Sequence, residues 1–267
     1  MSFLTILAEV VAVVAAMVAL AAVGIVGADR LRRLRRTARL RLRAVAPQLA
    51  VLAVVLLVNS AIRDVVPEFS WIIGWNITGY IFALEGTFVA FVQSFASPPL
   101  TAYFSFVYVY GYVFLLVFPL LAYAALDDAR PLRELVIAYS LNYGLGLLCY
   151  VLFIAYGPRN LLSDLVESLL YTTYPRYQLL TSRVNTNTNV FPSLHTSLSI
   201  TVAMLAWLSR DQYPKWTAIA TFGALSVVIA TMYLGIHWAT DVLAGLLLSA
   251  ASVALARRWV GDGSWRS

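Results

Sequence analysis

The sequence contains little charge, one cysteine, one lysine and two histidines. Charged residues make up 12% of its 267 residues, whereas about 25% is usual in soluble proteins. The single cysteine, Cys149, excludes an internal disulfide and a cysteine metal cluster. Lys215 lies in a short polar stretch, which excludes a Schiff-base lysine inside a membrane span. The composition therefore argues against soluble, disulfide-stabilised and retinal-type proteins.

Hydrophobic residues, by contrast, make up 61% of the chain and gather in long runs. Most of these runs are long enough for a helix to cross roughly 30 Å of hydrocarbon, and a helix satisfies its own backbone groups in lipid. The sequence predicts an all-α polytopic membrane helical bundle, with a six-helix core and one N-terminal accessory span. The predicted spans are Phe3–Gly27, Ala46–Ile62, Leu100–Leu126, Leu135–Tyr156, Leu194–Leu208, Trp216–Leu234 and Val242–Ala256.

One further apolar stretch, Trp71–Ala96, contains Glu85 and is followed by two prolines. A carboxylate in the middle of a span costs roughly 2.5–3.5 kcal/mol. If the stretch does not cross, fifteen basic residues lie on one side of the membrane and four on the other; if it crosses, the split is eleven to eight. Because cytoplasmic loops are rich in Lys and Arg, the first arrangement is favoured. We therefore expect this stretch to be interfacial or re-entrant, with the N-terminus outside and the C-terminus cytoplasmic.

Eight arginines lie between Arg30 and Arg43. Such a run can bind nucleic acid. Beside a membrane span, however, retention in the cytoplasm and contact with anionic lipid headgroups is the better interpretation. We expect the lipid bilayer, and no nucleic acid, as its partner.

The two histidines are predicted to lie at the same face of the membrane, at the ends of neighbouring spans. His195 follows Pro192 and Ser193 at a helix start, where outward-pointing backbone N–H groups attract an anion. His237 and Asp241 are four residues apart and thus share one helical face. The carboxylate can fix the imidazole tautomer and leave the other ring nitrogen free to attack.

This set of side chains fits phosphoryl transfer. A phosphoester needs a nucleophile, an acid for the leaving oxygen, and cations or N–H groups for the phosphoryl oxygens. His237 would be the nucleophile, and His195 would be the acid. The candidate phosphate ligands are Arg159, Ser193 and Arg183.

Each of these assignments has a structural alternative. Arg159 can simply extend to the interface at the end of a span, and Arg183 can be a solvated loop residue. Ser193 can serve only as a helix cap. Glu85 has either a functional role or a polar partner within the bundle.

Two segments resemble motifs of the type-2 phosphatidic acid phosphatase superfamily. The Pro-Ser-Leu-His sequence at Pro192–His195 resembles its second motif, usually Pro-Ser-Gly-His. Tyr233–Asp241 resembles its third motif, which ends in His, three residues and Asp. The resemblance covers about residues 100–256 and implies that His237 is the nucleophile, Asp241 its orienting carboxylate and His195 the acid.

The sequence also departs from the usual motifs. Tyr156–Arg159 stands where the first motif carries a lysine and then Arg-Pro, and Ala230 and Thr231 replace the usual Ser-Arg of the third motif. Leu194 replaces the second-motif glycine. These features resemble the inositol phosphorylceramide synthase branch, whose members transfer a phospho-headgroup between lipids.

The resemblance implies an integral membrane phosphatase or phosphotransferase that acts on lipid phosphoesters, and the distribution of basic residues predicts that its histidines face the extracytoplasmic side. We expect no cofactor and no metal, because no carboxylate cluster accompanies the histidines. Residues 1–45 would form the N-terminal span and arginine-rich cytoplasmic segment, and residues 46–267 the six-span catalytic membrane domain. Two other functions remain open: a bis-histidine haem membrane protein, which needs only two axial histidines, and a non-catalytic lipid transporter.

Overall fold

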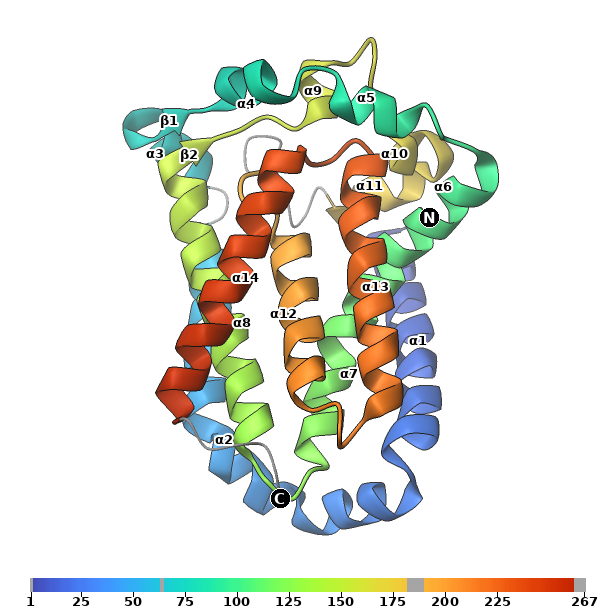
Figure 1. Ribbon diagram of the computed structural model, residues 1–267, viewed down its shortest axis with the longest axis vertical. Coiled ribbons are helices and arrows are strands. Elements are labelled where there is room, and N and C mark those ends of the chain that lie inside the picture. The colour runs from blue at the N-terminus through green and yellow to red at the C-terminus, as the bar shows by residue number, and fades with distance from the viewer. Residues whose placement is uncertain (1, 63–64, 182–189, 262–267) are drawn as a thin grey trace.

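The computed structural model describes residues 2–62, 65–181 and 190–261, and most of them are helical. Long helices run along the molecule, and short helices cover its upper end in Figure 1. This arrangement confirms the predicted all-α polytopic membrane bundle. The long helices are α1 (Phe3–Ala21) with the π-helix η1 (Ala22–Val26), α2 (Ala28–Ile62), α6 (Pro98–Phe106) with the π-helix η2 (Val107–Gly111) and α7 (Tyr112–Ala124), α8 (Arg130–Leu152), α12 (Leu194–Leu208), α13 (Pro214–Tyr233) and α14 (Ala239–Val260).

Each predicted span has a counterpart among these helices. Six helical segments in the described part of the chain are long and apolar enough to cross a membrane. The seventh, α12, has 15 residues and a length of about 22 Å. It packs against α8, α13 and α14, so most of its surface meets protein. A shorter helix is tolerated here because its neighbours, rather than lipid, surround it.

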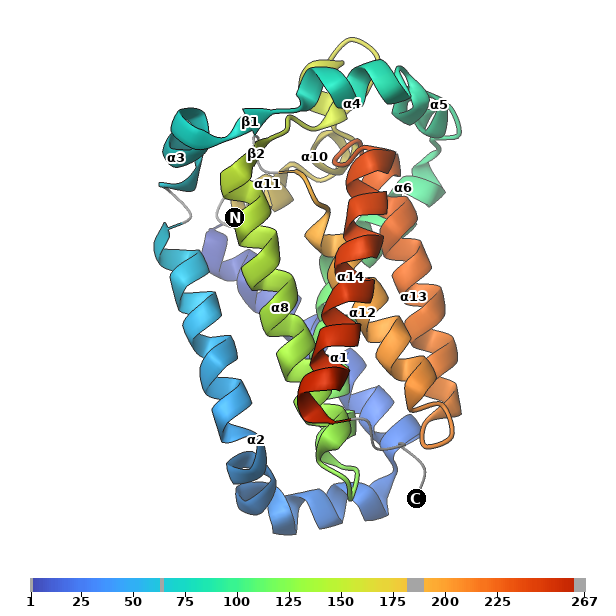
Figure 2. The same cartoon turned by 60° about the vertical axis from the view of Figure 1, so that its left-hand side comes forward.

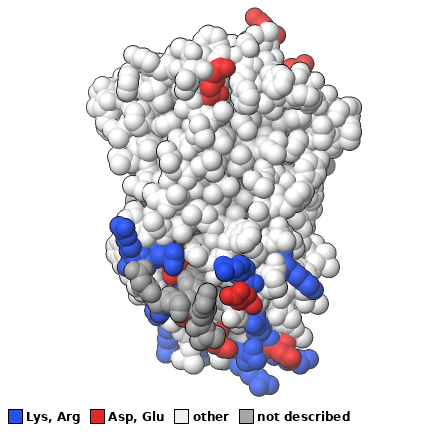
Figure 3. Space-filling model, in the orientation of Figure 1, with Lys and Arg blue, Asp and Glu red and all other residues white. Residues whose placement is uncertain are grey.

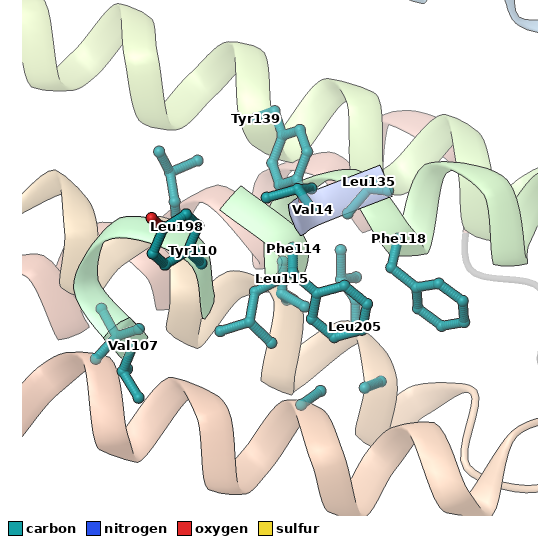
Figure 4. Packing of buried hydrophobic residues seen from close by; sticks show 14 of the residues in the cluster. Val14, Val107, Tyr110, Phe114, Leu115, Phe118, Leu135, Tyr139, Leu198 and Leu205 are labelled. Atoms are coloured by element: carbon teal, nitrogen blue, oxygen red, sulfur yellow. The ribbon is translucent and has the colours of Figure 1, made fainter. Parts of the chain in front are cut away.

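The core of the bundle lies between α7, α8, α12 and α13. Phe114 and Leu115 from α7 pack with Leu135 from α8 and with Leu198 and Leu205 from α12 (Figure 4). All five side chains are buried. Within a bilayer such close packing of side chains is a main source of helix association, since lipid tails are themselves apolar.

The arginine-rich segment and the second span form one helix, α2. Its first part runs across the lower end of the bundle, and its second part rises along the side next to α8 (Figures 1 and 2). Pro47 lies inside this helix, where a missing N–H group and a bulky ring favour a bend. The division at residues 45 and 46 falls within α2, and the two-part organisation of the chain stays a prediction.

Arginines of α2 bind to the loops at the lower end of the bundle. Arg30 donates to the side chain of Gln212 at 3.1 Å, and Arg41 forms an ion pair with Asp127 at 3.1 Å. Figure 3 shows Lys and Arg gathered at this end, below a middle zone that is almost free of charge on that face. Together with the apolar helices, this pattern is that of a multi-pass membrane protein.

The apolar stretch Trp71–Ala96 does not cross the bundle. It belongs to a run of short elements that lie across the upper end (Figure 1), and we name residues 66–93 the cap segment. Its longest helices have eight residues, or about 12 Å, which is too short to span. The cap segment comprises α3 (Val66–Ile73), β1 (Trp75–Asn76), α4 (Thr78–Glu85) and α5 (Phe88–Gln93).

The loop after α8 completes the upper end. Its strand β2 (Phe153–Ile154) pairs in parallel with β1, which joins the cap segment to the end of α8. The remaining elements of this loop are α9 (Pro158–Leu161), α10 (Leu169–Thr173), the 3-10 helix η3 (Pro175–Tyr177) and α11 (Gln178–Thr181).

Candidate active site

His237 and Asp241 form a buried pair at the upper end of α13 and α14. His237 lies in the turn between these helices, and its Nδ1 is 3.3 Å from Oδ2 of Asp241. Because a carboxylate only accepts hydrogen bonds, the neutral imidazole carries its proton on Nδ1, and Nε2 keeps its lone pair. The same Oδ2 accepts the backbone N–H of Trp238 at 2.9 Å, which fixes the carboxylate at the start of α14.

The turn that carries His237 depends on a glycine. Gly235 has a φ of 72°, a left-handed conformation that other residues rarely adopt. The backbone N–H of His237 then donates to the carbonyl of Thr231 at 3.0 Å. This tight turn holds the imidazole directly before the helix that contains Asp241.

His195 lies across from this pair, in the first turn of α12. Its ring centroid is 6.4 Å from that of His237. Tyr108 and Tyr112 contact the imidazole of His195, with centroid distances of 4.5 and 4.3 Å. These two tyrosines come from the π-helix η2 and the first residue of α7. They restrict the orientation of the His195 ring, and no motif or spacing in the sequence predicted this contact.

The start of α12 is joined to the start of α14. Ser193 caps α12, because its hydroxyl oxygen accepts the backbone N–H of Thr196 at 3.3 Å. The N–H of Ser193 donates to the carbonyl of Asp241 at 3.0 Å. Gly245 permits this approach, since a β-carbon there would lie 2.7 Å from the Ser193 carbonyl oxygen. The two motifs are therefore in direct contact.

Arg159 supplies a positive charge near the histidines. Its guanidinium stacks on the ring of Tyr171 at 4.7 Å, and its backbone N–H donates to the carbonyl of Gly235 at 3.1 Å. Its Nη1 is buried and has no hydrogen-bond partner among the described residues. A buried, unpartnered guanidinium nitrogen is costly unless an anion binds it.

The surroundings of His237 favour its neutral form. Burial and the Arg159 guanidinium both lower the pKa of the His237 imidazole, whereas a hydrogen bond with the Val190 backbone raises it. The net result is a pKa of about 3. The ordinary value is about 6.5. At neutral pH the imidazole is therefore unprotonated and able to attack.

Glu85 reaches the same site from the cap segment. One carboxylate oxygen, Oε2, accepts the backbone N–H of Ala239 at 2.8 Å, and Oε1 accepts that of Thr240. The sequence left two roles open for Glu85, a functional one or a polar partner within the bundle. The structure shows polar partners, which are backbone N–H groups at the start of α14. The sequence could not indicate this partner, because 154 residues separate Glu85 from Ala239.

The structure thus brings together His195, His237, Asp241, Ser193 and Arg159. Arg183 lies outside the described residues. No group of three or more His, Cys, Asp or Glu side chains suited to a metal ion was found in the described ranges. Metal independence and the individual catalytic roles stay predictions.

Comparison with known proteins agrees with the position of this site. A family model described as PAP2 superfamily matches residues 144–265. No curated protein and no solved structure matches the chain. The matched residues extend from within α8 to the C-terminal region and include Arg159, both histidines and Asp241. Over residues 144–265 the chain is therefore similar to the PAP2 superfamily, which implies phosphatase or phosphotransferase activity on phosphoesters.

Proposed function

We propose that this protein is a metal-independent lipid phosphatase or phosphotransferase. The observation that carries the proposal is the pair of imidazoles, one held by Asp241, whose centroids are 6.4 Å apart beside an unpartnered guanidinium nitrogen. Reacting atoms must approach to about 3–3.5 Å. A separation of this size suits one phosphoryl group between His237 and His195, with its oxygens bound by Arg159.

The reaction proceeds in two steps. In the first, Nε2 of His237 attacks phosphorus, and the bond from phosphorus to the leaving oxygen breaks while His195 donates a proton to that oxygen. Asp241 stabilises the imidazole as it gains positive character. In the second, His195 removes a proton from the acceptor hydroxyl, whose oxygen attacks the phosphohistidine and releases His237.

The phosphate pocket includes groups from three segments. Arg159 binds a phosphoryl oxygen through its fork of donors. The Ser193 hydroxyl uses its oxygen as a cap, so its hydrogen is available to the phosphate. Arg183 is proposed as a further ligand from its sequence position alone. The backbone N–H groups at the start of α12 add the favourable end of a helix dipole.

The substrate is proposed to be a membrane lipid at the extracytoplasmic face. Support comes from the position of the site at the upper end of the bundle, opposite the arginines of α2 (Figure 1). By resemblance to the inositol phosphorylceramide synthase branch, the acceptor is a second lipid alcohol, and water is the alternative acceptor. The C-terminus would then be cytoplasmic.

A lipid panel tests the function. Purified protein is incubated with phospholipids and prenyl phosphates in excess chelator, and free phosphate and new lipid products are measured together. We expect one of these products from the wild-type chain and none from His237→Ala. Acid-labile phosphate trapped on His237 supports the scheme, whereas label on His195 exchanges the two roles.

The same preparation separates the alternative functions. A haem protein would show a Soret absorbance band, and its two histidines would be required for that band. A lipid transporter would keep its transport activity after replacement of both histidines. Either result, together with the absence of both free phosphate and new lipid products, would overturn the proposal.

A further inference from the structure

The N-terminus of α14 is held by the carboxylate of Glu85, which lies outside the residues 144–265 that match the family model. The first two backbone N–H groups of α14, at Ala239 and Thr240, both donate to Glu85 at the end of α4. The first N–H groups of a helix have no partner within it. Here one bidentate carboxylate satisfies two of them, from a segment that lies across the end of the bundle.

Glu85 and Asp241 divide the N–H groups of this turn between them. Asp241 accepts the N–H of Trp238 and contacts His237, while Glu85 accepts the next two N–H groups. Without Glu85, these two donors would compete for the Asp241 carboxylate or for the phosphate of the substrate. Glu85 therefore leaves Asp241 free to hold the imidazole.

The cap segment holds Glu85 firmly in place. On one side of Glu85, the Ile77 N–H donates to the Ile154 carbonyl at 2.9 Å, and Thr78 Oγ1 accepts the Tyr156 N–H at 3.1 Å. On the other side, the Gln93 side chain binds both backbone groups of Glu167, with both distances 2.8 Å. A carboxylate anchored on both sides can fix a helix start more precisely than one on a free loop.

We propose that Glu85 is a positioning residue for the His237–Asp241 pair. This inference rests on the proposed phosphoryl transfer and extends its machinery to the cap segment. Glu85 touches neither histidine in the described contacts and acts through the backbone of α14. Its replacement should therefore slow the chemical step and leave substrate affinity nearly unchanged.

Three variants test the inference. Glu85→Ala should lower kcat on the order of ten- to a hundredfold, as expected when a catalytic group shifts by up to about 1 Å. Glu85→Gln should lose less, because it keeps one acceptor oxygen. Glu68→Ala is the matched control: Glu68 is an exposed carboxylate in α3 of the same cap segment, and its loss should change nothing. Rates are expressed per mole of protein that elutes as a single folded species in size-exclusion chromatography, which removes any effect of misfolded protein.

A double-mutant cycle tests whether Glu85 acts through the backbone of Ala239. Trp238 has φ −75° and ψ 159°, the conformation preferred before proline, and proline is favoured at the first helical position. Ala239→Pro removes one donor and places a ring carbon against the carboxylate. The double variant should be no slower than the slower single variant. If the two losses multiply, the sites are independent and the inference is wrong.

Hydrogen exchange gives a readout that does not depend on activity. Backbone amides of Ala239 and Thr240 should exchange faster in Glu85→Ala than in the wild type or in Glu68→Ala. Unchanged exchange overturns the inference even if the enzyme is active. Faster exchange with unchanged kcat, or a raised KM at constant kcat, overturns the positioning role. Inactivity of the wild type contradicts the proposed function, whereas the exchange result still decides whether Glu85 holds α14.

Discussion

At the scale of single residues, the proposed mechanism requires that His237 be uncharged when it attacks. Burial and the Arg159 guanidinium lower the pKa of this imidazole to about 3, so protonation does not compete with attack at ordinary pH. With a nitrophenyl phosphate, whose leaving group needs no proton from His195, the rate of His237 phosphorylation should not fall between about pH 7 and pH 5, where an ordinary histidine becomes protonated. Rapid-quench measurements across this range check the prediction.

Arg159→Gln should move the acid limb of the same profile to higher pH. Removing a nearby positive charge makes the imidazolium less unfavourable and so raises the pKa of His237. Arg210→Gln is the control, because Arg210 is exposed at the other end of the bundle. An acid limb near pH 6.5 in the wild type, or no shift in Arg159→Gln, would contradict this account.

Asp241→Asn should reduce kcat by about 10²–10⁴-fold, by comparison with other carboxylate-oriented histidines. The amide can present an NH₂ group to Nδ1, which favours the wrong tautomer. Asp211→Asn, an exposed change in the loop between α12 and α13, provides the control for expression and folding. A loss of less than threefold would mean that the 3.3 Å contact has no catalytic weight.

The sequence predicted those residues whose relation is local. His237 and Asp241 are only four residues apart, although His237 lies in the turn before α14 and not on its helical face, and Ser193 was already a candidate cap. The capping of α14 by Glu85 and the contact of Tyr108 with His195 join segments far apart in the chain. Spacing along one sequence contains no information on such contacts.

At the scale of elements, the π-helix η2 and the first residue of α7 supply the two tyrosines that contact His195. The ring centroid of Tyr112 is 4.3 Å from that of His195, and Tyr108 stacks on the same imidazole with a centroid distance of 4.5 Å. An aromatic pair contributes about 0.5–1.5 kcal/mol, which corresponds to roughly two- to tenfold in rate if it is lost in the transition state.

Tyr112→Leu should therefore slow turnover of a lipid substrate by about two- to tenfold, whereas Tyr112→Phe, which keeps the ring, should stay close to the wild type. The defect should be smaller with a nitrophenyl phosphate, whose leaving group needs no proton from His195. Equal losses with both substrates would show that Tyr112 does not act through the acid.

At the scale of the whole molecule, two labelled cysteines test the orientation. In a Cys149→Ala background, a cysteine at Asn160 in α9 should react with an impermeant thiol reagent in intact cells. A cysteine at Lys215, at the start of α13 and the opposite end of the bundle, should react only after the membrane is opened. Both positions are exposed. The reverse pattern would place the candidate site in the cytoplasm.

The spans of the bundle were predictable because hydrophobicity and charge can be summed along the sequence, one segment at a time. Run length and the distribution of arginines indicated the spans and argued against a crossing by Trp71–Ala96. The path of that stretch over the site depends on hydrogen bonds to a distant loop, such as the one from Gln93. The path of α2 beneath the bundle likewise depends on the hydrogen bond from Arg30 to another loop. These contacts form only when the helices have assembled, so a local reading of the sequence does not predict them.

The position of the histidines at one end of the bundle has a kinetic consequence. The cap segment around them exposes large aromatic side chains, among them Trp71, Trp75 and Tyr80, which favour the level of the lipid headgroups. The proposed lipid substrate, lying at that level, would reach the site by lateral diffusion within its own leaflet. Turnover should then follow the mole fraction of substrate in the leaflet, so diluting the vesicle with an inert lipid slows the reaction even when the amount of substrate per volume of solution is constant.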